Sequence, residues 1–166
     1  MINFGILTIS DRSSRGERED LSGPALVDLV KQHHWQTYTT AIIPDERSEI
    51  SSTLREWSSN PHIDVILTTG GTGFSQRDIT PEATLDVIER QTPGISEVMR
   101  TESLKKTPHA MLSRAVSGIL GKTLIINLPG SPRAAVENAL VVFPVLEHAV
   151  ELLQNLHIPD AHHKPH

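Results

Sequence analysis

The feature of this chain that most constrains its fold is an alternation of short apolar runs with segments of helical periodicity. Four runs are rich in Ile, Leu, Val and Thr and have the length of strands: NFGILTIS (3–10), WQTYTTAII (35–43), DVILTT (64–69) and KTLIINL (122–128). Uninterrupted apolar strands are typical of a parallel sheet that is covered on both faces. The order therefore predicts an α/β sandwich around a mainly parallel central sheet.

Helices are expected between and after these strands. The segments concerned are 23–34, 45–57, a helix capped by Thr80, a mostly helical stretch 93–120 and a long helix capped by Ser131. Leu85 and Ile88 should face inward from the Thr80 helix. Pro144 should kink or split the last helix, because proline cannot donate a helical hydrogen bond. The polar stretch 11–23 is expected to be a loop.

Length and composition exclude several classes of protein. The 166 residues fit one domain, expected over 1–156, followed by a polar tail 157–166 that is rich in histidine. Histidine-rich ends can bind metal but are usually incidental, and no function is assigned to the tail. There is no cysteine, which excludes disulfides and thiolate sites and suits a reducing cytosol.

Charge and hydropathy narrow the choice of partners. Lys and Arg number 15 against 20 Asp and Glu, so the net charge is −5 and a broad nucleic-acid footprint is not expected. No apolar run approaches the roughly 20 residues of a membrane span. The first residues lack the basic flank and cleavage site of a signal peptide. We therefore expect a cytoplasmic protein that contacts neither nucleic acid nor membrane.

The ends of the four expected strands carry unusual residues. Strand one ends in Ser10 and Asp11, strand two in Pro44 and Asp45, strand three in the glycine stretch TTGGTG, and strand four in NLPGSPR. Ligands of open α/β sheets bind beyond the carboxyl ends of the strands. If the strands are parallel, all these residues meet at one edge of the sheet.

The glycine stretch contains Gly70, Gly71, Thr72 and Gly73. Glycines permit positive φ and close approach of a ligand to the backbone, and successive N–H groups can form a concave anion site. The same glycines also suit a tight strand-to-helix turn without a ligand, and on their own they do not decide between the two. The stretch matches neither the Walker loop nor the dinucleotide-binding glycine pattern.

Two aspartates follow strands at this edge, and each has two interpretations. Asp78 is either a magnesium ligand facing bound phosphates or an N-terminal charge of the next helix. Asp45 is either a second metal ligand or the cap of the helix that begins near Glu46. Arg77 either neutralises phosphate or is solvated, and the solvated interpretation is favoured. Glu82 either completes the metal site or complements the helix dipole.

The segment LPGSPR offers a second anion site of the same physical type. Gly130 allows close approach, Ser131 begins a helix and Arg133 lies in its first turn. The alternative is an ordinary proline-flanked helix cap. Two such sites on one edge suggest either a ligand with phosphates at both ends or two ligands that meet.

At this level of detail the chain resembles a known family. TTGGTGFSQRDITPEAT together with NLPGSPRAAVEN resembles the molybdopterin adenylyltransferases, the MogA/MoaB group that includes the G domain of gephyrin. LTISDRSSRGEREDLSGPAL and IIPDE resemble the first and second strand ends of that family. The similarity covers nearly the whole chain, from Ile6 to Leu153.

The resemblance implies a homotrimer of three-layer α/β subunits that transfers AMP from ATP to molybdopterin, with Mg²⁺ and with release of pyrophosphate. The product, adenylylated molybdopterin, belongs to molybdenum cofactor biosynthesis, and transient contact with other proteins of that pathway is implied. By motif match Asp78 and Asp45 are the catalytic, metal-binding carboxylates. The expected substrate- and nucleotide-binding residues are Ser10, Asp11, Gly70, Gly71, Thr72, Gly73, Gly130, Ser131 and Arg133.

Two other functions stay open. The first is a non-catalytic molybdopterin-binding or carrier protein of the MoaB type, and the second is a nucleotide-binding domain of another pathway. A carrier needs anion binding but not two carboxylates beside a phosphate, so the pair Asp45 and Asp78 favours the enzyme. The surface around Met99, Leu104, Met111 and Leu112 is either a subunit interface or part of the core.

Overall fold

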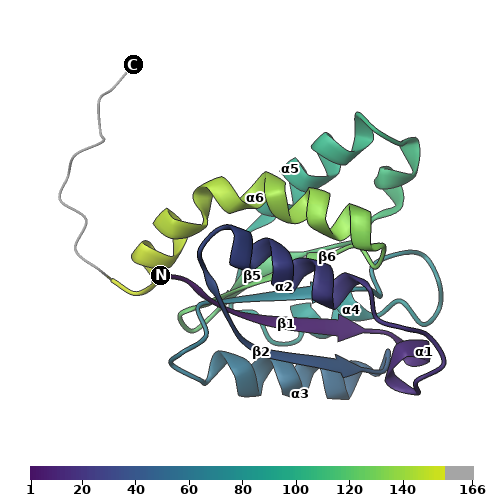
Figure 1. Ribbon diagram of the computed structural model, residues 1–166, viewed down its shortest axis with the longest axis horizontal. Coiled ribbons are helices and arrows are strands. Elements are labelled where there is room, and N and C mark those ends of the chain that lie inside the picture. The colour runs from purple at the N-terminus through teal and green to yellow at the C-terminus, as the bar shows by residue number, and fades with distance from the viewer. Residues whose placement is uncertain (156–166) are drawn as a thin grey trace.

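The computed structural model of this protein describes residues 1–155. Its centre is a six-stranded sheet in the order β2-β1-β3-β6-β5-β4 (Figure 1). The strands β1 (Asn3–Ile9), β2 (Gln36–Ile43), β3 (Val65–Thr69) and β6 (Thr123–Leu128) are mutually parallel. The short strands β5 (Ser117–Leu120) and β4 (Arg90–Gln91) extend the sheet in antiparallel pairing. The predicted α/β class with a mainly parallel sheet is confirmed.

Helices cover both faces of the sheet, which gives three layers. One core cluster packs α2 (Ser22–Gln32), α5 (Pro93–Leu104) and α6 (Pro132–Leu153) onto one face. The other packs α3 (Arg47–Ser58) and α4 (Thr80–Leu85) onto the opposite face. Neighbouring residues of β6 alternate between the clusters, with Ile126 in the first and Ile125 in the second. Apolar residues at successive positions of β1, β3 and β6 are therefore buried, as the sequence predicted. The edge strand β2 differs, because Tyr38 and Ile42 are exposed.

The four parallel strands end level with one another. Ile9 of β1 is paired with Ile43 of β2, while Thr69 of β3 is paired with Thr8 of β1 and Leu128 of β6. Their carboxyl ends therefore meet at one edge of the sheet, where α1 (Asp11–Ser14) lies next to the end of β1 (Figure 1).

The stretch 93–120 differs from the prediction. It contains α5 and the 3₁₀ helix η1 (Pro108–Leu112), but also β5, and β4 precedes it. Strands of two and four residues are too short to show a periodic pattern, and β5 is held by antiparallel pairing with β6. The short helix α1 was likewise missed within the expected loop 11–23.

Several local predictions can be compared with the helices. Ser131 caps α6, as expected, by accepting the N–H of Ala134 at 3.2 Å. Pro144 does not split α6, which runs as one helix to Leu153. Thr80 does not cap α4: it is fully buried, and its hydroxyl donates to the carbonyl of Gly70 at 2.9 Å.

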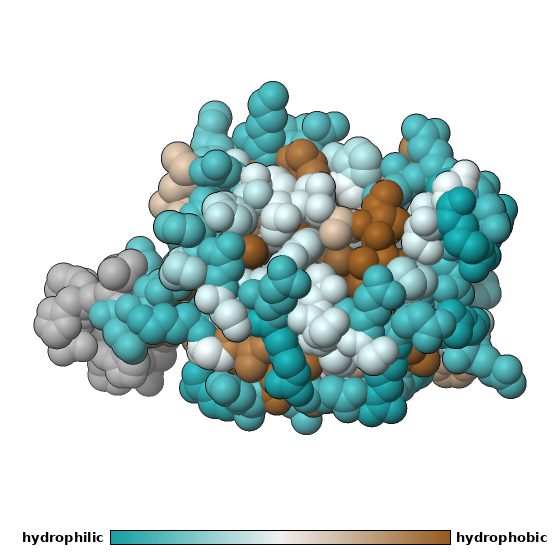
Figure 2. Space-filling model, turned by 90° about the horizontal axis from the view of Figure 1, so that it is seen from below, coloured by the Kyte–Doolittle hydropathy of each residue, from teal (hydrophilic) through white to brown (hydrophobic). Residues whose placement is uncertain are grey.

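Several large apolar side chains are exposed at the surface. Ile88 packs into the second core cluster as predicted, but Leu85 is 43% exposed and faces solvent, so its inward position was wrong. Met99 is core, whereas Leu104, Met111 and Leu112 are exposed. On the side of α3, apolar patches lie among hydrophilic side chains (Figure 2).

Within residues 1–155, no helix has both the length and the apolarity needed to cross a membrane. The histidine-rich tail lies outside the described residues.

Candidate active site

A polar cleft of about 340 Å³ lies at the carboxyl ends of the parallel strands. Seven of the residues predicted from sequence line it: Ser10, Asp45, Gly70, Gly71, Asp78, Gly130 and Ser131. The helix α1, the first turn of α2 and the segment between them also line the cleft, with Ser13, Arg18, Asp20 and Ser22, which the sequence did not single out. Four segments far apart in the chain, at the ends of β1, β2, β3 and β6, thus build one cleft.

Four predicted residues lie outside this cleft. Asp11 lies behind Asp45, and Thr72 and Gly73 line a neighbouring pocket. The Arg133 side chain is 87% exposed and pairs with Glu137 at 2.9 Å on the surface of α6. Its contribution to ligand binding stays a prediction.

The glycine turn after β3 requires glycine for steric reasons. Gly70 has φ of 105° and Gly71 has φ of 67°, a region that side chains disfavour. A Cβ on Gly70 would lie 2.2 Å from the carbonyl oxygen of Ile9, and one on Gly71 would lie 2.3 Å from the Thr80 hydroxyl. The turn is therefore packed against β1 and α4, which brings its backbone to the floor of the cleft.

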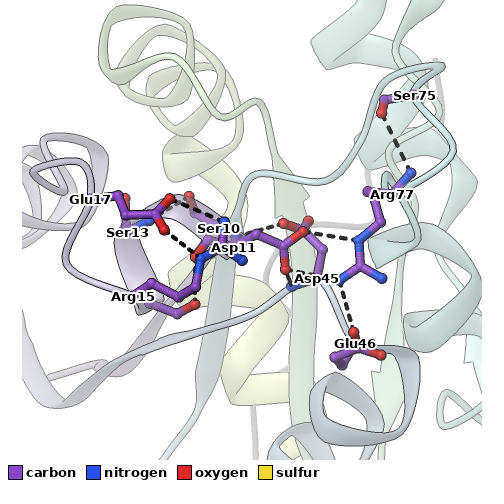
Figure 3. A network of polar contacts seen from close by, with 10 residues as sticks. Ser10, Asp11, Ser13, Arg15, Glu17, Asp45, Glu46, Ser75 and Arg77 are labelled. Carbon is purple, nitrogen blue, oxygen red and sulfur yellow. Dashed lines mark hydrogen bonds and ion pairs between the residues drawn. The ribbon is translucent and has the colours of Figure 1, made fainter.

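Asp45 is held by Asp11 rather than by a helix. The Oδ2 atom of Asp45 accepts the N–H of Asp11 at 2.9 Å, and Oδ1 of Asp11 accepts the N–H of Asp45 at 3.0 Å (Figure 3). Glu46 is the N-cap of α3, which has no side-chain cap, so the capping role of Asp45 was wrong. The Oδ1 atom of Asp45 lies against Gly71, where an added Cβ would be 3.0 Å away.

Burial raises the pKa of the Asp45 carboxyl, and the charges of Asp11 and Asp78 raise it further, while the hydrogen bond from the Asp11 N–H acts in the opposite direction. Asp45 is only 8% exposed. A buried carboxylate beside two other carboxylates is a place where a cation is favourable.

Asp78 lies beside Gly73, the last glycine of the stretch. Its Oδ2 atom accepts the N–H of Ser75 at 3.0 Å and would lie 2.9 Å from a Cβ on Gly73. The N-cap of α4 is Ile79, without a side-chain cap, so Asp78 makes no capping bond. Asp45 and Asp78 thus face one cleft, and each has one oxygen fixed by a backbone N–H.

The Arg77 side chain is 54% exposed, as expected of a solvated residue, but it also forms ion pairs that were not expected. Its guanidinium donates to both carboxylate oxygens of Asp11 at 2.9 Å and to Glu46 at 2.8 Å (Figure 3). The ion pair with Arg77 lowers the pKa of Asp11. Because Asp11 in turn holds Asp45, Arg77 connects the loop of Asp78 to the ends of β1 and β2.

Arg114 was missed by sequence reasoning. It lies between η1 and β5, and its Nε donates to the carbonyl of Gly73 at 2.7 Å. The same guanidinium donates to the carbonyl of Asp78 and pairs with Glu82, whose pKa it lowers. Glu82 does not line the cleft, so it is not a third carboxylate there. No local pattern around Arg114 indicates contacts with a loop 36 residues away.

The carboxylates of the polar cleft suit a metal ion that is bound together with a phosphorylated ligand. Among residues 1–155, no group of three or more His, Cys, Asp or Glu could hold a metal. Mg²⁺ is commonly bound by one or two carboxylates together with substrate phosphates and water. Asp45 and Asp78 therefore fit Mg²⁺ that is shared with a phosphorylated ligand.

A second pocket, of about 270 Å³, lies beside the polar cleft. Its apolar lining includes Met99, Leu112 and Pro129, and Thr72 and Gly73 contribute to it. The glycine stretch therefore contributes Gly70 and Gly71 to the polar cleft and its next two residues to an apolar pocket.

A parallel sheet with a polar cleft at its strand ends, floored by a glycine turn and faced by a helix N-terminus, is the arrangement in which α/β proteins commonly bind phosphorylated ligands. This chain belongs to the family described as "Probable molybdopterin binding domain", which matches residues 5–148.

Named relatives agree with this assignment. A molybdopterin adenylyltransferase of Helicobacter pylori strain J99 is 43% identical over 154 residues, which cover 92% of this chain and 88% of the relative. The molybdenum cofactor synthesis protein cinnamon of Drosophila melanogaster is 45% identical over 153 residues, and the chain spans 26% of its length. The crystal structure of a molybdopterin biosynthesis enzyme MoaB from Thermus thermophilus superposes with a TM-score of 0.88 at 45% identity, covering 93% of this chain and 98% of that one.

Proposed function

We propose that this protein is a molybdopterin adenylyltransferase, which transfers AMP from ATP to molybdopterin and releases pyrophosphate in molybdenum cofactor biosynthesis. The observation that carries the proposal is that Asp45 and Asp78 line one polar cleft, Asp45 beside Gly71 and Asp78 beside Gly73. The relatives named for this activity support it, because their similarity extends over most of the chain.

The reaction needs positioning and charge neutralisation more than covalent chemistry by side chains. A phosphate oxygen of molybdopterin attacks the α-phosphorus of ATP, a new P–O bond forms, and the bond to pyrophosphate breaks. The backbone N–H groups of the glycine turn and of the first turn of α6 at Ser131 hold phosphate oxygens. Asp45 and Asp78 would hold Mg²⁺, which supplies neutralising charge to the phosphates.

The two cavities suit two parts of the substrates. The polar cleft takes phosphate groups, because backbone donors and the N-terminus of α6 surround it. The apolar pocket takes one flat heterocycle, since its lining is mostly apolar and it begins at Thr72 and Gly73. The glycine stretch lines both cavities, so a ligand in the polar cleft and a ligand in the apolar pocket would contact each other there. Transfer of a group between two substrates requires such a contact.

A carrier without catalysis is the second candidate. It would bind phosphate in the same cleft, but two carboxylates there repel a phosphate unless a cation is present. Burial is the main cause of the raised pKa of Asp45, and the negative charges of Asp11 and Asp78 contribute to it, which is consistent with repulsion between these carboxylates. This favours a metal-dependent enzyme.

The test is incubation of the purified protein with molybdopterin, ATP and Mg²⁺, followed by detection of adenylylated molybdopterin and pyrophosphate. Asp78→Asn is run beside it, with Asp28→Asn as a matched control on the exposed face of α2. Product from the wild type and the control but not from Asp78→Asn supports the proposal. Tight binding of molybdopterin without product would favour the carrier.

We further propose that the protein is a cytoplasmic homotrimer. The exposed apolar side chains of Leu104, Met111 and Leu112, on α5 and η1, support a contact between copies. Sedimentation equilibrium should give three times the chain mass of 18.3 kDa. A monomer mass at micromolar concentration would contradict this part of the proposal.

A further inference from the structure

One guanidinium joins the two ends of the loop that carries Asp78. Arg114 Nε donates to the carbonyl of Gly73 at 2.7 Å. Its Nη2 donates to the carbonyl of Asp78, which is five positions further along the chain. The backbone N–H of Arg114 also donates to the carbonyl of Thr72 at 2.9 Å. The loop is therefore closed at its base by a residue from a distant part of the chain.

The guanidinium is itself fixed by Glu82. This carboxylate, in the first turn of α4, pairs with Nη1 and lies 3.5 Å from Nη2 of Arg114. The ion pair leaves Nε and Nη2 directed at the two carbonyls. Hydrogen bonds from a charged donor are stronger than neutral ones, and the planar fork of arginine fixes their directions.

Little else holds the middle of this loop. Residues 74–77 are exposed, so their side chains contribute no core packing. Inside the loop, Ser75 donates its N–H to the Asp78 carboxylate and accepts the N–H of Asp78, each at 3.0 Å. Arg77 ties the outer side of the loop to Asp11 and Glu46. The backbone at Gly73 and Asp78 is held by Arg114.

We propose that Arg114 is a positioning residue that keeps the Asp78 carboxylate at the place where Mg²⁺ and phosphate are bound. The proposal rests on the proposed function, because that function gives Asp78 its role as a metal ligand. Arg114 does not line the polar cleft and does not touch the reacting groups. It acts through the backbone of Gly73 and Asp78.

The first measurement is hydrogen exchange of the ligand-free protein, followed by mass spectrometry of peptides that span residues 70–80. Arg114→Gln should accelerate exchange in this segment and leave β1 and β6 unchanged. Arg114→Lys should lie between Arg114→Gln and the wild type, because an ammonium can donate to the carbonyls but lacks the fork. Arg47→Gln is the matched control: it breaks an exposed ion pair with Asp86 at the other end of α4.

The second measurement is the Mg²⁺ dependence of turnover. Outer-shell partners of metal ligands usually change metal affinity or activity by about 10- to 100-fold, and a rise of that size in the half-saturating Mg²⁺ concentration is expected for Arg114→Gln. The KM for molybdopterin should change much less. The lysine variant should recover part of the loss, and Arg47→Gln should match the wild type.

Any of three results would overturn the proposal. The first is unchanged exchange of the loop in both Arg114 variants, and the second is exchange that accelerates equally in β1 and β6. The third is a faster-exchanging loop with an unchanged Mg²⁺ dependence. Hydrogen exchange is measured without substrate, so it reports whether Arg114 holds the loop even if the protein has no activity. An inactive wild type would count against the adenylyltransferase activity and not against the role of Arg114 in holding the loop.

Discussion

Asp11 and Asp45 exchange backbone-to-carboxylate hydrogen bonds across the ends of β1 and β2, at 2.9 and 3.0 Å. The exchange occupies Oδ2 of Asp45, and among residues 1–155 its Oδ1 has no hydrogen-bond partner and lies against Gly71. Oδ1 is thus placed for a ligand before any ligand binds. Such preorganisation reduces the cost of ordering the site when metal and phosphate enter.

Asp78→Asn should abolish turnover while the fold remains intact. The amide keeps an oxygen that can accept the N–H of Ser75, which the carboxylate accepts at 3.0 Å, but it removes the charge that holds Mg²⁺. Activity and thermal unfolding are measured on the same preparation. Residual turnover near the wild-type rate would show that Asp78 is not the metal ligand.

Arg77→Gln should reduce activity by about 10- to 100-fold, because it removes the clamp on Asp11 and through it the support of Asp45. The free energy of unfolding should change little, since the Arg77 side chain is exposed to solvent. Arg15→Gln, which breaks an exposed pair with Glu17, is the matched control and should be active. Equal activity of both variants would contradict the clamp.

Asp45→Asn should make the ligand-free protein more stable at neutral pH and inactive. The pKa of Asp45 is raised in the folded state, so its ionised form destabilises the fold. That destabilisation is absent below the unfolded pKa and grows as pH rises through the raised folded pKa. The difference in Tm between the variant and the wild type should therefore shrink in acid. A variant less stable than the wild type at neutral pH would show that Asp45 contributes net stability as an anion.

Gly71→Ala should destabilise the protein by about 1–3 kcal/mol, the usual cost of a strained backbone position, and by more if Thr80 cannot move. Its φ is 67°, and the new Cβ would lie 2.3 Å from the Thr80 hydroxyl. Gly94→Ala is the control, because a Cβ there meets nothing within 4 Å in α5. Chemical denaturation compares the two, and equal stabilities would disprove the steric requirement at Gly71.

Ser131→Ala should weaken phosphate binding and cost about 1 kcal/mol of stability, because it removes the cap of α6 inside the cleft. Arg133→Ala should produce a milder loss of molybdopterin affinity, since that side chain lies outside the cleft and pairs with Glu137. Titration of molybdopterin into each variant tests both. An unchanged affinity in Arg133→Ala would remove this residue from the site.

Much of the architecture was encoded in local patterns of the sequence. The apolar runs predicted β1, β2, β3 and β6, and the motif Ser131-Pro132 predicted the start of α6. Parallel strands place their carboxyl ends at one edge whatever their side chains are, so the convergence of the strand-end residues followed from the fold class. These features depend on periodicity and on short-range steric rules, which a sequence shows directly.

The roles of individual polar residues were decided only by tertiary structure. Asp45 had the features of a helix cap but is bound to Asp11, 34 positions away, and Thr80 fastens the glycine turn instead of capping α4. Arg77 and Arg114 reach partners 66 and 36 positions away. A polar side chain satisfies its hydrogen bonds with whatever group the fold brings near, and that proximity leaves no trace in neighbouring residues. The sequence therefore determined where a site would form, and long-range packing determined which side chains hold it in place.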